Sequence, residues 1–142
     1  MLHLQHHQYQ PLNFKEASML NDIKEFHEKF ELAYKGKPRL LDKEDALFRI
    51  KFMQEELDEY IKACNENDLA GSLDALVDLI YVALGTAYRQ GLPFKEGWDI
   101  VHACNMSKER ALPDGSNSKR SSAFDIVKPQ SWRSPDYSKI LG

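Results

Sequence analysis

Two aspartates stand in the most apolar stretch of the sequence, which makes them the first candidates for a chemical site. From Leu73 to Leu84 the chain reads LDALVDLIYVAL, with Asp74 and Asp78 as its only charged residues. This composition predicts a helix that is buried on nearly all sides. Because successive helical residues are 100° apart, both aspartates point the same way. Two buried carboxylates need a bound cation or an ion pair, such as one with Arg49 or with a lysine of another helix.

A second acidic group precedes the aspartates, in the run Glu55-Glu56-Leu57-Asp58-Glu59. On a helix, Glu56 and Glu59 lie three residues apart at the border of an apolar stripe, whereas Glu55 lies toward solvent. Two antiparallel helices can bring this pair next to the two aspartates. Oxygen donors of this kind suit Mg²⁺ or Mn²⁺ better than Zn²⁺. The sequence therefore predicts a magnesium site made by Glu56, Glu59, Asp74 and Asp78.

A third group follows near the end of the last long helical pattern. Asn105 and Lys108 are three residues apart, so an amide and a cation share one helical side. A cation facing a magnesium cluster suits a polyphosphate, because the metal binds some oxygens and the lysine binds others. Lys128, in the basic C-terminal segment, is a further candidate phosphate ligand. Alternatively, Lys108 only compensates the negative end of the helix dipole.

Together these segments resemble the all-α nucleotide pyrophosphohydrolases, and are most similar to the MazG-like and phosphoribosyl-ATP pyrophosphohydrolase-like branch. The likeness extends from about Phe14 to Leu141. It rests on four segments: EELDE at 55–59, DALVDLIYVALG at 74–85, NMSK at 105–108 and KPQSWRSPD at 128–136.

The resemblance implies a magnesium-dependent enzyme that hydrolyses a nucleoside triphosphate between its α and β phosphates, releasing nucleoside monophosphate and pyrophosphate. By position, Glu56, Glu59 and Asp78 match the metal ligands of the family, and Glu55 matches the acid that orients or deprotonates the attacking water. The second acidic pair of the family is usually spaced ExxD, which would place an acid at Ala75, whereas here the partner is Asp74. The resemblance also implies a homodimer or a homotetramer.

Helices must position these residues, because apolar residues recur at intervals of three and four and β-branched residues are few. We expect an all-α fold with a four-helix core, a loose arm over residues 1–12 and a single domain over 13–142. This domain ends in an extended basic tail from about residue 113. The expected helices cover residues 13–34, 42–64, 69–90 and 94–111, with Asp42 as an N-cap and Gly91 closing the third. The expected core stripe of the second helix is Ala46, Leu47, Ile50, Met53, Leu57, Tyr60, Ile61 and Cys64.

Composition narrows the function class further. The chain has 142 residues and a formal net charge of −3, which argues against a general nucleic-acid binder. Residues 1–101 carry 12 basic and 18 acidic side chains, whereas residues 102–142 carry 7 and 4. With two cysteines, no signal sequence and no long uncharged apolar run, we expect a soluble, cytoplasmic protein that does not enter a membrane. No glycine-rich loop of the Walker or Rossmann type is present.

Three alternatives stay open. A di-iron carboxylate bundle also collects acids in a helical core, but it needs two Glu-x-x-His pairs and the nearest element is Asp99-Ile-Val-His102. A non-catalytic helical interaction protein would explain the apolar helices by burial against a partner. Phosphoribosyl-ATP is an alternative substrate. The base-binding residues are unassigned, because aromatic residues at helical spacing, Phe26, Phe30 and Phe52, are typical of a core.

Overall fold

The computed structural model describes residues 18–142, which divide into two compact units. One unit contains residues 18–33 and Lys51–Gly85, and the other contains Tyr34–Ile50 and Thr86–Gly142. The expected arm over residues 1–12 and the expected helix start at Asn13 lie outside the described residues.

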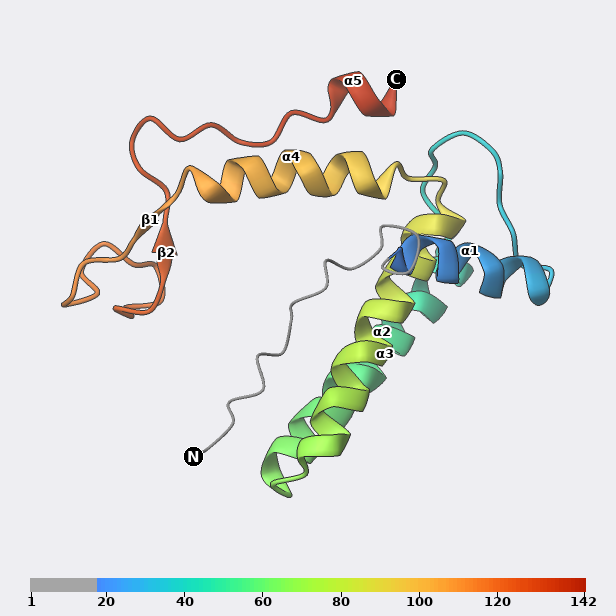
Figure 1. Ribbon diagram of the computed structural model, residues 1–142, viewed down its shortest axis with the longest axis horizontal. Helices are drawn as coiled ribbons and strands as arrows, with labels where there is room; N and C mark the ends of the chain where they lie inside the picture. The colour runs from blue at the N-terminus through green and yellow to red at the C-terminus, as the bar shows by residue number, and fades with distance from the viewer. Residues whose placement is uncertain (1–17) are drawn as a thin grey trace, which may run out of the picture. The chain divides into compact units, whose positions relative to one another are not determined.

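Helices dominate the described part of the chain, which confirms the all-α prediction (Figure 1). Its elements are α1 (Met19–Lys29), α2 (Lys43–Asn65), α3 (Leu69–Arg89), α4 (Phe94–Met106), β1 (Glu109–Arg110), β2 (Ile126–Val127) and α5 (Ser138–Leu141). The four longer helices correspond to the four that the sequence predicts.

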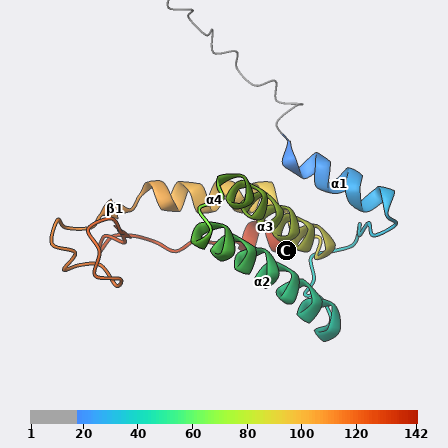
Figure 2. The same cartoon turned by 90° about the horizontal axis from the view of Figure 1, so that it is seen from below.

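In the first unit, α2 and α3 run antiparallel and side by side, as Figures 1 and 2 both show. A short turn joins them, and the Asp68 side chain caps α3 by accepting a 2.9 Å hydrogen bond from the Gly71 backbone N–H. The small buried side chains of Ala63 and Ala75 leave room for two helices to approach closely. Helix α1 contacts this pair through Phe26, whose ring centroid lies 5.3 Å from that of Tyr81.

Helix α1 ends at Lys29, so the predicted end at Tyr34 is wrong. Glu31 adopts a positive φ of 57°, and the Leu32 backbone N–H returns to the His27 carbonyl at 2.8 Å. This reversal satisfies the last carbonyl groups of the helix and turns the chain away from its axis. No glycine marks the site, which is why residue types alone indicate a longer helix.

In the second unit, both predicted helix signals are confirmed. Asp42 caps α2 by accepting a 2.8 Å hydrogen bond from the Asp45 N–H, and Gly91 follows α3 with a φ of 65°. Arg89 forms a two-pronged ion pair with Asp45, with N–O distances of 2.8 and 2.7 Å. This pair joins the end of α3 to the start of α2.

Helix α4 ends at Met106 instead of continuing to Ala111, which corrects the predicted boundary. The Ser107 hydroxyl and backbone N–H both donate to the Cys104 carbonyl, at 2.7 and 3.2 Å, and close the helix. Residues 109–110 then pair antiparallel with residues 126–127. The expected extended tail therefore contains a two-stranded ladder and a short final helix, α5.

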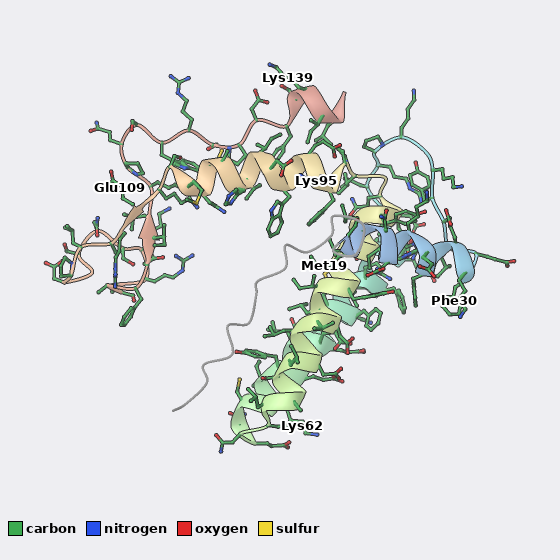
Figure 3. All side chains as sticks on the ribbon, in the orientation of Figure 1. Met19, Phe30, Lys62, Lys95, Glu109 and Lys139 are labelled. Carbon is green, nitrogen blue, oxygen red and sulfur yellow. The ribbon has the colours of Figure 1, made fainter. Side chains whose placement is uncertain are left out.

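Burial on α2 and α3 differs from the predicted pattern. The buried positions of α2 are Arg49, Glu56 and Ala63, which recur every two helical turns. Much of the expected apolar stripe is exposed instead, and α3 is not buried all round: Leu73 is 65% exposed and Ile80 is 51% exposed. Figure 3 draws the side chains that project from these two helices, with Lys62 labelled near the end of α2. The face of α2 that carries Arg49, Glu56 and Ala63 therefore packs inward, and much of its apolar face is exposed.

Candidate active site

The acidic residues of α2 and α3 form one electrostatic cluster in the first unit. At its centre is Glu56, which is only 8% exposed and whose Oε2 atom has no hydrogen-bond partner among residues 18–142. Burial raises the pKa of Glu56 above its ordinary value, and the nearby carboxylates of Glu59, Asp78 and Asp74 raise it further.

The pKa of Asp78 is raised as well. Burial is the largest cause, and the negative charges of Asp74 and Glu59 add to it. Among residues 18–142, no basic group contributes to the pKa shift of either Glu56 or Asp78. Arg49, the arginine considered as an ion-pair partner, donates through Nε to the Thr86 hydroxyl at 2.9 Å. Within the described residues, the cluster is thus an accumulation of negative charge without a compensating basic group.

The donor set fits a hard divalent cation in its chemistry. The four side chains offer carboxylate oxygens, one of which, Glu56 Oε2, is buried without a partner. In the part of the chain that the structure describes, no three Asp, Glu, His or Cys side chains already surround a common point as metal ligands would. The oxygens are therefore gathered on one face but not arranged as a finished coordination sphere.

Glu55 lies outside the buried cluster. It is exposed on α2, next to Glu56 in sequence, as the helical spacing predicts. Asp58, in the same acidic run, is also exposed and accepts a 2.9 Å hydrogen bond from Gln54 Nε2. The run therefore separates into an inward carboxylate at Glu56 and solvent-facing carboxylates on either side of it.

The predicted phosphate ligands belong to the second unit. Asn105 is exposed in the last turn of α4, and Lys108 follows the end of this helix. Lys108 and Lys128 lie 20 positions apart in the chain, yet both ammonium groups lie over the ring of Trp132, at 5.5 and 4.4 Å from its centroid. The contact between Trp132 and Lys108 could not be predicted from spacing, because it joins two segments that are far apart in the sequence.

The sequence model of the phosphoribosyl-ATP pyrophosphohydrolase family matches residues 23–105, which is more than half of the chain. The chain belongs to this family. The match contains both acidic segments and reaches Asn105. Membership makes the protein a nucleotide pyrophosphohydrolase, a hydrolase that acts on phosphoanhydride bonds. No curated protein sequence matches the chain.

Helix α3 is long and apolar enough to cross a membrane by length and composition alone. The phosphoribosyl-ATP pyrophosphohydrolase family is a family of soluble enzymes, so α3 is a helix of a soluble protein. Asp74 and Asp78 lie within it, at a depth where unpaired carboxylates would oppose insertion into lipid.

Three aromatic side chains, Phe26, Phe30 and Tyr81, form a connected group in the first unit. The Phe26 ring lies 4.8 Å from Phe30 and 5.3 Å from Tyr81, measured between centroids. Burial raises the pKa of the Tyr81 hydroxyl, with smaller contributions from Asp22 and Glu25. Tyr81 comes three residues after Asp78, which places it on the same side of α3. Helical spacing alone does not predict the contact of Tyr81 with α1.

Proposed function

We propose that this pyrophosphohydrolase cleaves ribo- or deoxyribonucleoside triphosphates between the α and β phosphates, with Mg²⁺ as its metal and Mn²⁺ as a substitute. The observation that supports the proposal is the uncompensated acidic cluster around the buried, unpaired Oε2 atom of Glu56. Such a cluster favours a divalent cation, and a divalent cation in turn attracts the oxygens of a polyphosphate.

In this proposal Glu56, Glu59 and Asp78 hold the metal, and Asp74 binds it directly or through water. These carboxylates would hold a divalent cation, which would supply charge neutralisation at the phosphate oxygens and a lowered pKa for water. Glu55 orients the attacking water and accepts its proton. The water oxygen bonds to one phosphorus of the α–β phosphoanhydride. The bond between this phosphorus and the bridging oxygen breaks, and the bridging oxygen leaves with the other phosphate group. Asn105, Lys108 and Lys128, which belong to the second unit, are the proposed phosphate ligands of that unit.

Phosphoribosyl-ATP is the second candidate substrate, favoured by the description of the matching family. It contains the same α–β phosphoanhydride as a nucleoside triphosphate, so the acidic cluster and the lysines suit both molecules equally. The two differ at the base, where the alternative substrate carries an additional phosphoribosyl group.

Product analysis tests both candidates in one experiment. The protein is incubated with Mg²⁺ and, separately, with each common nucleoside triphosphate and with phosphoribosyl-ATP, and the products are identified by phosphorus NMR. Monophosphate and pyrophosphate from a triphosphate would support the first candidate, and turnover of phosphoribosyl-ATP alone would support the second. Formation of diphosphate and phosphate would contradict both. Omitting Mg²⁺ in the presence of EDTA is the control for metal dependence.

The same proposal includes self-association into a homodimer or a homotetramer. Its support is the row of exposed apolar side chains in the N-terminal half of α3. These residues recur at helical spacing: Leu69, Leu73, Leu76, Val77 and Ile80. An exposed apolar row of this length is typical of a surface that another protein covers. The free thiols Cys64 and Cys104 support a reducing, cytoplasmic compartment.

A further inference from the structure

Trp132 links two segments that sequence alone leaves unconnected. Its indole Nε1–H donates a 2.9 Å hydrogen bond to the Cys104 carbonyl, at the C-terminal end of α4. The same carbonyl also accepts the two bonds from Ser107 that close the helix. The ring is therefore fixed to a helix end, half-buried, in the segment that Figure 1 shows returning along α4.

Two ammonium groups share this one ring. Lys128 Nζ lies 4.4 Å and Lys108 Nζ 5.5 Å from the ring centroid, so the two nitrogens are no more than about 10 Å apart. An indole face attracts a cation through its quadrupole, which offsets part of the repulsion between two like charges. Because Trp132 is itself fixed, it limits where both lysine side chains can go.

Within residues 18–142, neither lysine forms an ion pair with a carboxylate. No Asp or Glu oxygen of these residues lies within 4.0 Å of Lys108 Nζ or Lys128 Nζ, whereas Lys95 is paired with Asp99 at 2.6 Å. The indole ring is not a hydrogen-bond acceptor in the ordinary sense, so the ammonium N–H groups stay available to an anion. Two such groups at this separation suit an anion with several charged oxygens, such as a polyphosphate.

We propose that Trp132 is a positioning residue that holds Lys108 and Lys128 together as a two-lysine site for the pyrophosphate part of the substrate. This inference rests on the proposed function for its choice of ligand. It extends that function by assigning a role to Trp132, which touches no reacting atom and acts through the two lysines.

Tryptophan fluorescence tests the site without catalysis. The sequence contains two tryptophans, and Trp98→Phe leaves Trp132 as the only source of tryptophan fluorescence. In this background, titration with inorganic pyrophosphate is expected to change the emission of Trp132 saturably, because bound anion pulls the ammonium groups away from the ring. Adding Lys108→Met or Lys128→Met should weaken binding at least tenfold. The matched control is Lys139→Met, an exposed lysine on α5 labelled in Figure 3, which should leave binding unchanged.

Steady-state kinetics separates positioning from a merely structural role. With the preferred nucleotide, Trp132→Ala should raise KM at least tenfold while kcat changes less than threefold. Trp132→Phe should recover much of the loss, because phenylalanine keeps an aromatic face although it cannot donate to Cys104. A uniform loss of kcat with a lowered Tm in both variants would instead indicate a structural role and overturn the proposal.

The two proposals fail separately. A flat titration, or equal pyrophosphate affinity in the lysine variants and their parent, overturns the role of Trp132 even where the protein hydrolyses nucleotides. Saturable, lysine-dependent pyrophosphate binding in a protein that hydrolyses no nucleotide supports the site and overturns the proposed function.

Discussion

At the residue scale, Glu56 shows how an unfavourable feature of a fold can indicate its use. A buried carboxylate beside three others lowers the stability of the metal-free protein, because burial removes hydration and the neighbouring charges repel. The side chain is nevertheless held inward by the face of α2 that carries Arg49 and Ala63. A site of this kind becomes favourable when a cation binds.

Replacement of this group gives the first prediction. Glu56→Gln keeps the size of the side chain and removes its charge, so the variant should be more stable than the parent protein in EDTA at pH 8, measured by urea unfolding. It should also lose most of the increase in Tm that Mg²⁺ produces in the parent. The control is Asp58→Asn, an exposed change in the same run. A Glu56→Gln protein that is stabilised by Mg²⁺ as much as its parent would show that the metal binds elsewhere.

Glu55 should behave differently from Glu56, because it is exposed and is proposed to act on water instead of the metal. Glu55→Gln should keep the Mg²⁺-dependent rise in Tm but lower kcat by about 10²- to 10⁴-fold, the usual contribution of a general base. Calorimetry with and without Mg²⁺ measures the rise in Tm, and phosphorus NMR measures turnover. Asp58→Asn, in contrast, should change kcat less than about twofold. Loss of the Tm response in Glu55→Gln would move this residue into the metal site.

How far these residues could be predicted depends on the range of the contact. The grouping of Glu56 with Asp74 and Asp78 follows from residue type and helical spacing, because each helix fixes its own side-chain directions. The contact of Trp132 with Lys108 depends on the path of the chain between residues 108 and 132. Local spacing carries no information about that path.

At the element scale, helix ends were predictable where a side chain or a glycine marks them. Asp42 and Gly91 act through their own chemistry, an acceptor oxygen and a permitted positive φ. The ends of α1 and α4 were not predictable. Glu31 takes a positive φ without being glycine, and Glu109 and Arg110 pair with residues that lie 18 and 16 positions further along the chain.

Gly91 gives a prediction at this scale. Its φ of 65° disfavours any side chain, and a Cβ atom would lie 2.9 Å from the Gly36 carbonyl oxygen. Gly91→Ala should therefore lower the free energy of unfolding by about 1–3 kcal/mol, measured by urea unfolding. The matched control is Gly97→Ala within α4, where nothing lies within 4 Å of the new Cβ. That change should raise stability by about 0.5–1 kcal/mol. Equal effects of both changes would contradict the assigned role of Gly91.

The stability of the protein should depend on pH through Asp125, which lies in the loop between β1 and β2. A hydrogen bond from Ser118, and then bonds from the Ile126 N–H and Arg120, lower the pKa of Asp125, although partial burial opposes them. An acid with a lowered folded-state pKa stabilises the fold above its unfolded pKa of about 4, and the effect disappears as pH falls through the folded value. Asp125→Asn should therefore lower Tm at pH 7.

The difference in Tm between the parent and Asp125→Asn should shrink as the pH is lowered below about 4. Thermal unfolding followed by circular dichroism at a series of pH values measures it. A difference that stays constant from pH 7 to pH 3 would mean that the charge of Asp125 does not contribute, and that only the shape of its hydrogen bonds does.

At the scale of the whole molecule, the helical periodicity of the sequence was right about the elements and wrong about the face of α2 that packs inward. Leu57 and Ile61 were expected in the core, but they are exposed, while Glu56 is buried. An amphipathic pattern records which side chains avoid water in the working assembly. It does not say whether the cover comes from the same chain or from another, so it cannot tell a core position from one that a single chain leaves exposed.

The proposed self-association can be tested at a single position. Ile80 lies on the exposed apolar row of α3 and is 51% exposed, so in a homodimer it would be buried by a second chain. Ile80→Lys places a charge there, which is costly in an interface without a partner charge. The molar mass from light scattering should fall to that of one chain, while the helical circular dichroism signal is retained.

The matched control for this change is Leu40→Lys, which adds the same charge at a loop residue that is 87% exposed and lies off the apolar row. It should leave the molar mass of the assembly unchanged. If Ile80→Lys also keeps the parent's mass, the row on α3 is not the interface. If the parent itself has the mass of one chain, the apolar row is left without a second copy to cover it, and the assembly proposal is wrong.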